Sequence, residues 1–457
     1  MSKTNRIILA IILLLTGPLW LSGPGNAQRP TLIRDTETED IIRAYSTPIF
    51  KAAGLKASEV KIYIVKDDTL NAFVAGGQKL FINTGLILQS DSANQIIGVI
   101  AHETGHIAGG HLSRVHDALS KSSTTSILTA ILGGAAAVTT GRGDLGAAII
   151  AGGHATAVRN FLAYSRVQEG SADHAAIKYL EKTKQSAKGL LQFMEKLGDQ
   201  ELLSPAQQDP YVRSHPLTRE RIATLADHVA SSAYSEQTDP MGYEPRHQRM
   251  KAKILAFLKP YAFTLRVYKK SDQSVPSRYA RAVAEYRRAK LEPALVLING
   301  LIAEAPHDPY FHELKGQMLF EHGRTAEAIS AYGRAAELLP GAPLIRRDLA
   351  RAQLDSNDPA LLDQAITNLE VALVTQRDSA SNWRFLAIAY GRKGEQGRSF
   401  LALAEEALLK RKPEIARFQA GRAKKIFARG SRSWLQAEDI LLAADELDRV
   451  LKREKSR

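Results

Sequence analysis

The 457-residue sequence contains no cysteine. This absence excludes disulfide bonds, thiolate metal ligands and cysteine nucleophiles, so the fold does not depend on the redox state of its compartment. Long apolar runs are also missing. Beyond residue 27, no stretch reaches the ~20 consecutive apolar residues that a membrane-spanning helix needs. Because cysteine is absent, any catalytic metal site must be built from histidine and carboxylate side chains.

The length favours two or three domains rather than one. The net charge of +13 at pH 7 is compatible with an acidic partner, such as an anionic lipid surface or a nucleic acid. Charge of this kind is more often only a solvated surface. Composition therefore indicates a chain with room for a sizeable core and leaves its partners open.

The first 27 residues have the pattern of a signal peptide. Lys3 and Arg6 precede an apolar core over residues 7–15, and small residues before position 28 predict cleavage after Ala27. The alternative is an uncleaved membrane anchor, but the run is short and Pro18 interrupts it. Without a cysteine, lipoprotein processing is excluded. We expect an exported protein, which in a Gram-negative cell means a periplasmic one.

The sequence His-Glu-Thr-Gly-His over residues 102–106 is the motif around which the chain is organised. On a helix, His102 and His106 lie on one face and can bind one metal ion, while Glu103 lies beside it as a general base. Ser92 is a predicted N-cap, and Gly109-Gly110 predicts the end of this helix. The alternative of two structural core histidines is much weaker. The motif predicts a hydrolytic metal centre.

A catalytic zinc needs a third protein ligand. Six residues after the second histidine the sequence has Leu112, and His111 is out of register, so a three-histidine pattern is rejected. Glu169 is the favoured ligand, because Asp173 lies one helical turn on and can support a ligating histidine. His174 points elsewhere on the same helix and is the remaining candidate.

The residues before the motif predict a small sheet. An amphipathic helix is expected over residues 33–53, with Pro48 breaking or bending it. A strand over residues 60–65 and a hairpin over residues 71–83 follow, with a short helix around Leu86. The hairpin next to the motif helix either guides a peptide substrate as an added strand or is purely structural.

Residues 122–157 are rich in Ala, Gly, Ile and Thr and predict a helical hairpin. It is either a buried core hairpin or a mobile lid, or a surface that contacts membrane or unfolded substrate. Helices are then expected from Ser165, over residues 187–197, and from Ser214 with Pro216 near the first turn.

From residue 277 an internal repeat of 34 residues appears, the period of tetratricopeptide (TPR) repeats. For example, Ala282 recurs as Gly316, Ala294 as Ala328 and Pro306 as Pro340. Generic Ala-rich helices are the alternative. We therefore predict a mainly α protein with this division: signal peptide 1–27, helical zincin-type peptidase domain with a small β-sheet 28–262, linker 263–276, all-α TPR solenoid 277–430, helical tail 431–457.

Together these motifs resemble the gluzincin metallopeptidases of family 48, which include the HtpX, Oma and prenyl-protein-protease types. With a signal peptide in front and TPR units behind, the chain is similar to the periplasmic BepA-like branch. The absence of spanning helices after residue 27 argues against the membrane-peptide substrates of membrane-embedded members. The segments that carry the resemblance are Asn71-Ala72-Phe73, Gly76-Gly77, Thr84-Gly85-Leu86, His102-Glu103-x-x-His106, Ser165-Arg166-x-x-Glu169-x-x-Ala172-Asp173, and His215-Pro216 with Arg221-Ile222.

The resemblance implies one zinc ion per chain, held by His102, His106 and Glu169. It implies that Glu103 is the general base and that Asp173 supports the ligands. It also implies that His215 comes near the site, where it either stabilises the oxyanion or caps the zinc in a resting state. The alternative for this residue is a surface histidine that starts a helix.

The predicted function is that of a zinc-dependent endopeptidase. Its expected substrates are misfolded or stalled envelope proteins, and its TPR arm is expected to bind outer-membrane assembly machinery. The alternative is a chaperone or scaffold whose proteolysis is latent. Nucleic-acid binding is disfavoured by export and by the absence of a recognisable motif. A peripheral membrane contact by residues 122–157 is a further expectation.

Overall fold

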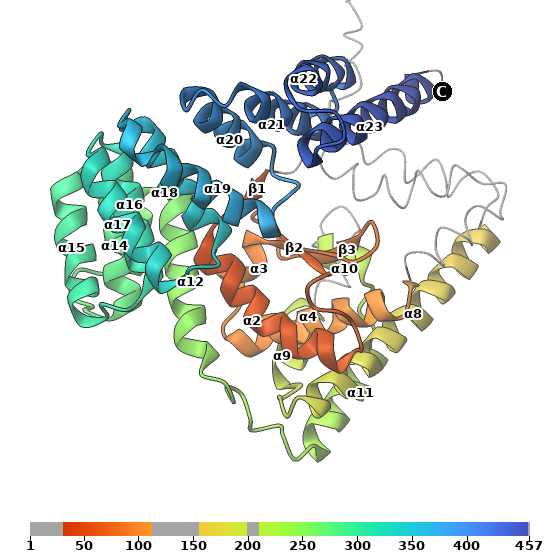
Figure 1. Cartoon of the computed structure of the whole chain (residues 1–457). Helices are drawn as coiled ribbons and strands as arrows, with labels where there is room; N and C mark the ends of the chain where they lie inside the picture. The colour runs from red at the N-terminus through yellow and green to blue at the C-terminus, as the bar shows by residue number, and fades with distance from the viewer. Residues whose placement is uncertain (1–30, 112–154, 199–209, 456–457) are drawn as a thin grey trace, which may run out of the picture.

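The computed structural model describes residues 31–111, 155–198 and 210–455, and shows an α/β part followed by a curved array of helix pairs (Figure 1). This confirms the mainly α fold with a solenoid-like C-terminal region. The signal peptide, nearly all of residues 122–157 and Leu112 lie outside the described residues. Among the described helices, none is long and apolar enough to cross a membrane. The domain boundaries stay predictions.

The sheet has four strands in the order β1-β2-β4-β3. The hairpin β3–β4 is antiparallel, and its turn contains Gly76 and Gly77, both with positive φ. β2 and β4 run parallel, while β1 pairs antiparallel with β2. The predicted strands are confirmed, but β1 was missed because two residues give no periodicity. The strands are β1 (Leu32–Ile33), β2 (Lys61–Val65), β3 (Ala72–Ala75) and β4 (Lys79–Asn83).

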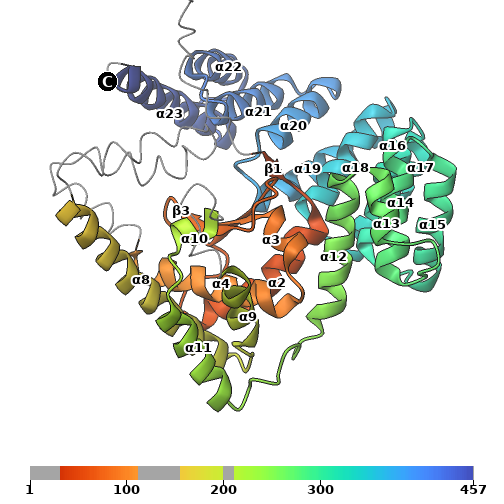
Figure 2. The same cartoon turned by 180° about the vertical axis from the view of Figure 1, so that it is seen from behind.

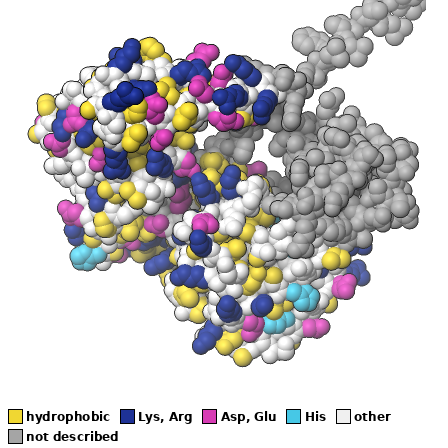
Figure 3. All heavy atoms as spheres, turned by 45° about the vertical axis from the view of Figure 1, so that its right-hand side comes forward, with side chains coloured by type: hydrophobic (Ala, Val, Ile, Leu, Met, Phe, Trp, Pro, Cys, Tyr) yellow, Lys and Arg dark blue, Asp and Glu magenta, His cyan; other side chains and the backbone are white. Residues whose placement is uncertain are grey.

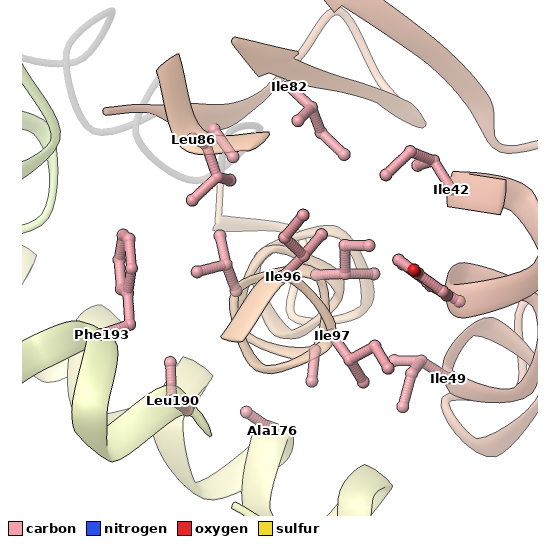
Figure 4. Close-up of a cluster of buried hydrophobic side chains, with 14 of the residues drawn as sticks. Ile42, Ile49, Ile82, Leu86, Ile96, Ile97, Ala176, Leu190 and Phe193 are labelled. Carbon is pink, nitrogen blue, oxygen red and sulfur yellow. The ribbon is translucent and has the colours of Figure 1, made fainter. Parts of the chain in front are cut away.

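Helix α4 (Ala93–Ala108), which carries the motif, lies at the centre of the core (Figure 4). Its N-cap is Ser92, as predicted, and the Ser92 side chain accepts from the Gln95 N–H. Side chains from the sheet and four helices converge on α4, so the motif helix is held from several sides. These helices are α2 (Thr36–Ala52), α3 (Thr84–Gln89), α8 (Ala155–Lys182) and α9 (Lys188–Gly198).

Pro48 does not break the first helix, because α2 continues through it to Ala52, and a bend at this proline stays a prediction. Proline has no N–H, so the carbonyl of Ala44 loses its helical partner. The hydroxyl of Tyr243 donates to this carbonyl oxygen at 3.1 Å. A residue almost two hundred positions away thus satisfies the group that Pro48 leaves unpaired.

Two predicted helix starts are also wrong. Helix α8 begins at Ala155, so Ser165 lies inside it rather than at its N-cap. Pro216 lies between two helices rather than in the first turn of one. A proline disfavours the α conformation of the residue before it, so no helix runs through His215. The preceding helix ends at Ser214, and Thr218 caps the next one by accepting from the Arg221 N–H.

In the C-terminal array, the first helices of three successive pairs begin at Val275, Pro309 and Pro343. Each of these starts lies 34 residues after the start of the first helix in the preceding pair. A Cβ on Gly316 would lie 2.7 Å from the Tyr332 ring, so a small residue is required where the paired helices touch. The helices are α10 (Pro210–Ser214), α11 (Arg219–Ser231), α12 (Tyr243–Leu258), α13 (Tyr261–Val267), α14 (Val275–Arg287), α15 (Leu291–Glu304), α16 (Pro309–Glu321), α17 (Thr325–Leu338), α18 (Pro343–Asp355), the 3₁₀ turn η2 (Pro359–Leu361), α19 (Leu362–Thr375), α20 (Ala380–Arg392), α21 (Gln396–Leu409), α22 (Pro413–Ile426) and α23 (Arg432–Lys455).

Buried charges join the two parts of the molecule. Lys253 of α12 contacts Asp35 at 2.5 Å and Glu37 at 3.3 Å, both at the start of α2. Tyr279 of α14 donates to the Glu37 carboxylate at 2.8 Å. Because Lys253 and Glu37 are almost fully buried, this network fixes the first solenoid helices against the α/β part.

Candidate metal centre

Two neighbouring helices carry the histidine and carboxylate motifs (Figure 2). Helix α4 presents His102 and His106 one turn apart, and α8 presents Glu169. A Cβ on Gly105 would lie 2.8 Å from the carbonyl oxygen of Ala172 and 2.9 Å from its Cα. The glycine therefore lets α8 approach α4 closely enough for Glu169 to reach both histidines.

Four side chains bring their donor atoms together: His102, His106, Glu169 and His215. The two Nε2 atoms of His102 and His106 are 3.1 Å apart. The carboxylate oxygens of Glu169 lie 3.3 Å from the first of these atoms and 3.4 Å from the second. Nδ1 of His215 lies 3.3 Å from His102 Nε2 and 3.2 Å from Glu169 Oε2. All four residues are buried.

This arrangement fits a four-coordinate zinc ion. Zn–N and Zn–O bonds of ~2.0–2.1 Å in a tetrahedron separate neighbouring donors by about 3.3 Å. Five of the separations between donor atoms run from 3.1 to 3.4 Å, and all four donors lie within 4.8 Å of one another. Histidine nitrogens and one carboxylate are also the donor types that zinc prefers when cysteine is absent.

His215 is placed by the end of α10. The backbone N–H of His215 donates to the carbonyl oxygen of Tyr211 at 2.7 Å. The rings of the two residues stack, with their centroids 4.6 Å apart. The short helix therefore delivers a third histidine to the cluster from a segment distant in sequence. The structure does not place it on the surface.

A carboxylate and a guanidinium lie behind the donor set. Asp173 Oδ1 lies 2.8 Å from Nδ1 of His102, the ring nitrogen that faces away from the cluster. Arg221 of α11 contacts Asp173 through Nη2 at 2.9 Å and Glu169 through Nη1 at 3.2 Å. The sequence shows Arg221 only as part of a motif, and the structure places its single positive charge between the two carboxylates.

The electrostatics of the cluster favour a positive charge between its carboxylates. Burial disfavours a charged His102, but hydrogen bonds to Asp173 and Glu169 outweigh burial and raise its pKa to about 10. Burial would raise the pKa of Glu169, yet His215 and His102 hold this pKa well below its usual value. A bound metal cation would supply the positive charge that this site stabilises.

Glu103 is fully buried, and neither of its carboxylate oxygens has a hydrogen-bond partner within the part of the chain that the structure describes. Oε1 lies 3.4 Å from Nε2 of His215. Burial raises the pKa of the Glu103 carboxyl. A buried carboxylate that makes no hydrogen bond, lies beside the donor cluster and has a raised pKa has the properties of a general base.

The two other histidines considered from the sequence, His174 and His111, lie outside the donor cluster. His174 is exposed and contacts the carbonyl oxygen of Gly170 at 2.8 Å, outside the donor cluster. His111 is not among the clustered donors either, but its Nδ1 lies 2.9 Å from Nδ1 of His106. Sequence reasoning missed this contact, because residues five apart do not share a helix face and only the Gly109-Gly110 turn brings them together.

Comparison with known families agrees with the geometry. Residues 35–229, which contain the whole cluster, match the sequence profile of Peptidase family M48. The chain carries an M48 peptidase domain. The resemblance drawn from the motifs is thereby confirmed, and the match supports a metallopeptidase.

Relatives extend beyond the M48 domain. The chain is 23% identical over 388 residues to the Beta-barrel assembly-enhancing protease of Yersinia pestis, covering 83% of this chain and 77% of that protein. It is 22% identical over 391 residues to the protein of the same name from Escherichia coli K12, covering 82% and 76%. Solved structures of MamA cover 36–38% of this chain with TM-scores of 0.28–0.32, too low to carry an argument.

Proposed function

We propose that this protein is an exported zinc endopeptidase that acts in outer-membrane protein assembly. The observation that carries the proposal is the buried Glu103 carboxylate, which makes no hydrogen bond within the described residues and lies beside four converging donors. The names of the relatives, which describe enhancement of β-barrel assembly, support the process. The predicted signal peptide supports a periplasmic location.

In this proposal His102, His106 and Glu169 hold one zinc ion. A zinc ion held there would supply Lewis-acid chemistry, which polarises a carbonyl and lowers the pKa of a water molecule. Glu103 takes the proton of the attacking water and delivers it to the nitrogen of the leaving amine. Asp173 keeps the ring of His102 oriented by accepting from its Nδ1–H.

His215 has a separate role in the proposal. Its Nδ1 lies among the donors, which corresponds to the fourth position that a catalytic zinc keeps for water or substrate. We assign His215 as a cap of the resting site, which must swing away before a substrate carbonyl can enter. The oxyanion role is less favoured, because that role requires the ring to face the substrate rather than the donors.

The edge strand β3 is the proposed substrate guide. Within the described residues β3 pairs only with β4, so its outer edge can accept an extended peptide as an added strand. β3 also packs against α4, which carries the motif. A peptide paired with β3 would therefore run past the metal donors in a fixed register.

Protein partners are proposed for the solenoid, since stacked helix pairs form extended binding surfaces. Nucleic acid is not proposed as a partner. On the face that Figure 3 shows, Lys and Arg side chains are interspersed with Asp and Glu, and no continuous basic surface forms there.

The decisive experiment compares wild type with Glu103→Gln. The variant is expected to bind one zinc per chain and to lose casein cleavage by at least ~100-fold, because general-base catalysis contributes about 10²–10⁴. Glu220→Gln, an exposed glutamate of α11, is the matched control and should keep full activity. Cleavage by Glu103→Gln at the wild-type rate would refute the assignment of the base.

A second arm separates the peptidase from the chaperone alternative. Glu103→Gln is introduced into a strain that lacks the protein and has an outer-membrane defect. We expect the variant not to restore the outer membrane. Full restoration would show that proteolysis is secondary to a scaffolding role of the solenoid.

A further inference from the structure

The ring of His111 packs against His106 on the side opposite the donor cluster. Their Nδ1 atoms are 2.9 Å apart, with ring centroids at 4.9 Å and planes at 81°. His111 is 4% exposed. His106 therefore has one nitrogen among the donors and the other nitrogen against a second buried histidine.

This arrangement determines where the protons lie when a metal is bound. A neutral imidazole has one N–H donor and one acceptor nitrogen. To offer a lone pair at Nε2, His106 must carry its proton on Nδ1, and this N–H then donates to Nδ1 of His111. His111 must accept there and carry its own proton on Nε2.

We infer that His111 is the positioning residue of His106, fixing its tautomer and ring orientation for the metal. The inference rests on the proposed metal site and goes beyond it, because His111 touches neither metal nor substrate in this role. Its action corresponds to that of Asp173 on His102, but with a neutral acceptor in place of a carboxylate. His106 is therefore the more weakly supported histidine of the pair.

The backbone is shaped for this contact. Gly109 ends α4, and Gly110 has φ of +61°, a left-handed conformation that turns the chain back toward the helix. A Cβ on Gly109 would lie 2.4 Å from Nε2 of His111. The glycine pair thus both returns His111 to His106 and leaves room for its ring.

The test measures zinc affinity by chelator competition on the full chain, together with the visible absorption of the cobalt-substituted protein. His111→Phe keeps an aromatic ring without an acceptor, and His111→Gln keeps an acceptor without the ring. We expect about 10-fold or greater loss of affinity in the Phe variant. The Gln variant should stay within a few-fold of wild type with a near-native cobalt spectrum, and His174→Ala, an exposed histidine, should bind as wild type.

Wild-type affinity in the Phe variant, or equal losses in the Phe and Gln variants, would overturn the inference. Thermal unfolding of the metal-free proteins, compared across variants, separates lost folding from lost positioning. If wild type itself binds no zinc, the proposed function fails first. If wild type binds zinc and His111→Phe does too, only the role of His111 fails.

A second, independent observation concerns the outer face of α22. Six of the twelve large hydrophobic side chains that are exposed in the described residues fall within residues 409–442. Three of them lie on α22, where Ile415, Phe418 and Ile426 are 47%, 62% and 53% exposed. With Arg422 and Lys425 between them, they form one stripe at helical spacing, here named the α22 face.

The charges of α22 divide between two sides. Toward α23, Arg417 pairs with Asp445 and Lys424 pairs with Glu438. On the α22 face, the structure gives neither Arg422 nor Lys425 an ion pair within the residues it describes. The guanidinium of Arg422 instead lies 3.7 Å from the centroid of the Phe400 ring.

We propose that the α22 face docks on an anionic phospholipid surface. Large apolar side chains interleaved with cations, on one exposed helix, are the pattern of helices that lie in the membrane interface. The apolar side chains would enter the acyl boundary, while the cations contact lipid phosphates. Figures 1 and 2 both place α22 at one end of the array of helix pairs, beside α21 and α23.

The test is co-sedimentation of the full chain with vesicles that contain phosphatidylglycerol, against vesicles of phosphatidylcholine alone. We expect binding to the anionic vesicles that weakens with added salt. Phe418→Ser with Ile426→Ser, and separately Arg422→Gln with Lys425→Gln, should each reduce binding about fivefold or more. Val296→Ser with Val374→Ser is the control, because both valines are more than 70% exposed and lie on other helices.

Equal binding to both vesicle types, no binding, or unchanged binding of the α22 variants would overturn this proposal. Light scattering adds a further arm. If wild type self-associates and Phe418→Ser abolishes this association without affecting vesicle binding, the α22 face belongs to a second copy of the chain and not to lipid.

Discussion

Asp173 Oδ1 lies 2.8 Å from Nδ1 of His102, and the same carboxylate pairs with the buried guanidinium of Arg221. Asp173→Asn is expected to weaken zinc binding by about 10–100-fold, because an amide is a poorer acceptor for the histidine N–H. It also leaves Arg221 with one fewer carboxylate. Chelator competition measures the effect, and Asp227→Asn on the exposed side of α11 is the control. Unchanged affinity would contradict a supporting role for Asp173.

The contact between Gly105 and Ala172 leads to a prediction about helix spacing. Gly105→Ala should push α8 away from α4, lower the free energy of unfolding by about 1–3 kcal/mol and weaken zinc binding. Gly170→Ala adds the same methyl group on α8, where nothing lies within 4 Å. This control should be neutral, or more stable by up to about 1 kcal/mol. Equal effects of the two substitutions in denaturant unfolding would show that the close approach is unimportant.

Removing the fourth donor distinguishes the two roles of His215. If His215 caps the site, His215→Ala should weaken zinc binding modestly and raise basal peptide hydrolysis, since the open position becomes accessible. Initial rates on a fluorescent peptide, at saturating zinc, give the answer. His174→Ala serves as the reference. A fall in kcat with zinc fully retained would instead support oxyanion stabilisation.

The buried carboxyl of Glu313 predicts a pH dependence of stability. Burial raises its pKa from 4.5 to about 8, although Lys253 opposes the shift. Between these pH values the folded chain keeps a proton that the unfolded chain has lost, so Glu313 makes stability fall as pH rises from 4.5 to 8. Glu313→Gln removes this contribution. The fall in the free energy of unfolding between these pH values should then be smaller by a few kcal/mol, at about 1.4 kcal/mol per pKa unit.

Thermal unfolding measured from about pH 5 to about pH 9 tests this effect, because buried carboxyls can titrate in this range. Glu337→Gln, on the exposed side of α17, is the matched control and should leave the pH profile unchanged. A parallel profile for Glu313→Gln and wild type would show that Glu313 titrates normally.

The hydrogen bond from Tyr243 to Ala44 can be isolated with a double-mutant cycle. Tyr243→Phe should cost about 1 kcal/mol, because it leaves the partly buried carbonyl of Ala44 without its hydrogen-bond donor. In a Pro48→Ala background the helix can satisfy this carbonyl itself, so the same substitution should cost less. Additive effects in urea unfolding would contradict the proposed link between the two residues.

Local patterns predicted much of this fold. Alternating apolar residues and the Gly76-Gly77 turn predicted the hairpin, Ser92 predicted the start of α4, and a 34-residue recurrence predicted the helix pairs. Each signal arises within one element or between adjacent ones. Sequence failed at Pro48, where helix continuity depends on Tyr243, and at the start of α8, where flanking polar residues imitate a cap.

The sequence by itself determined which chemistry the protein can perform. Without cysteine, and with His102, Glu103 and His106 at helical spacing, it permits a histidine and carboxylate metal site and little else. Tertiary structure decided how that site is completed and supported. The approach of α8 at Gly105, the delivery of His215 by α10, the charge of Arg221 and the return of His111 all depend on contacts between separate segments. Such contacts leave no periodicity in the sequence, because packing and not local spacing brings these side chains together.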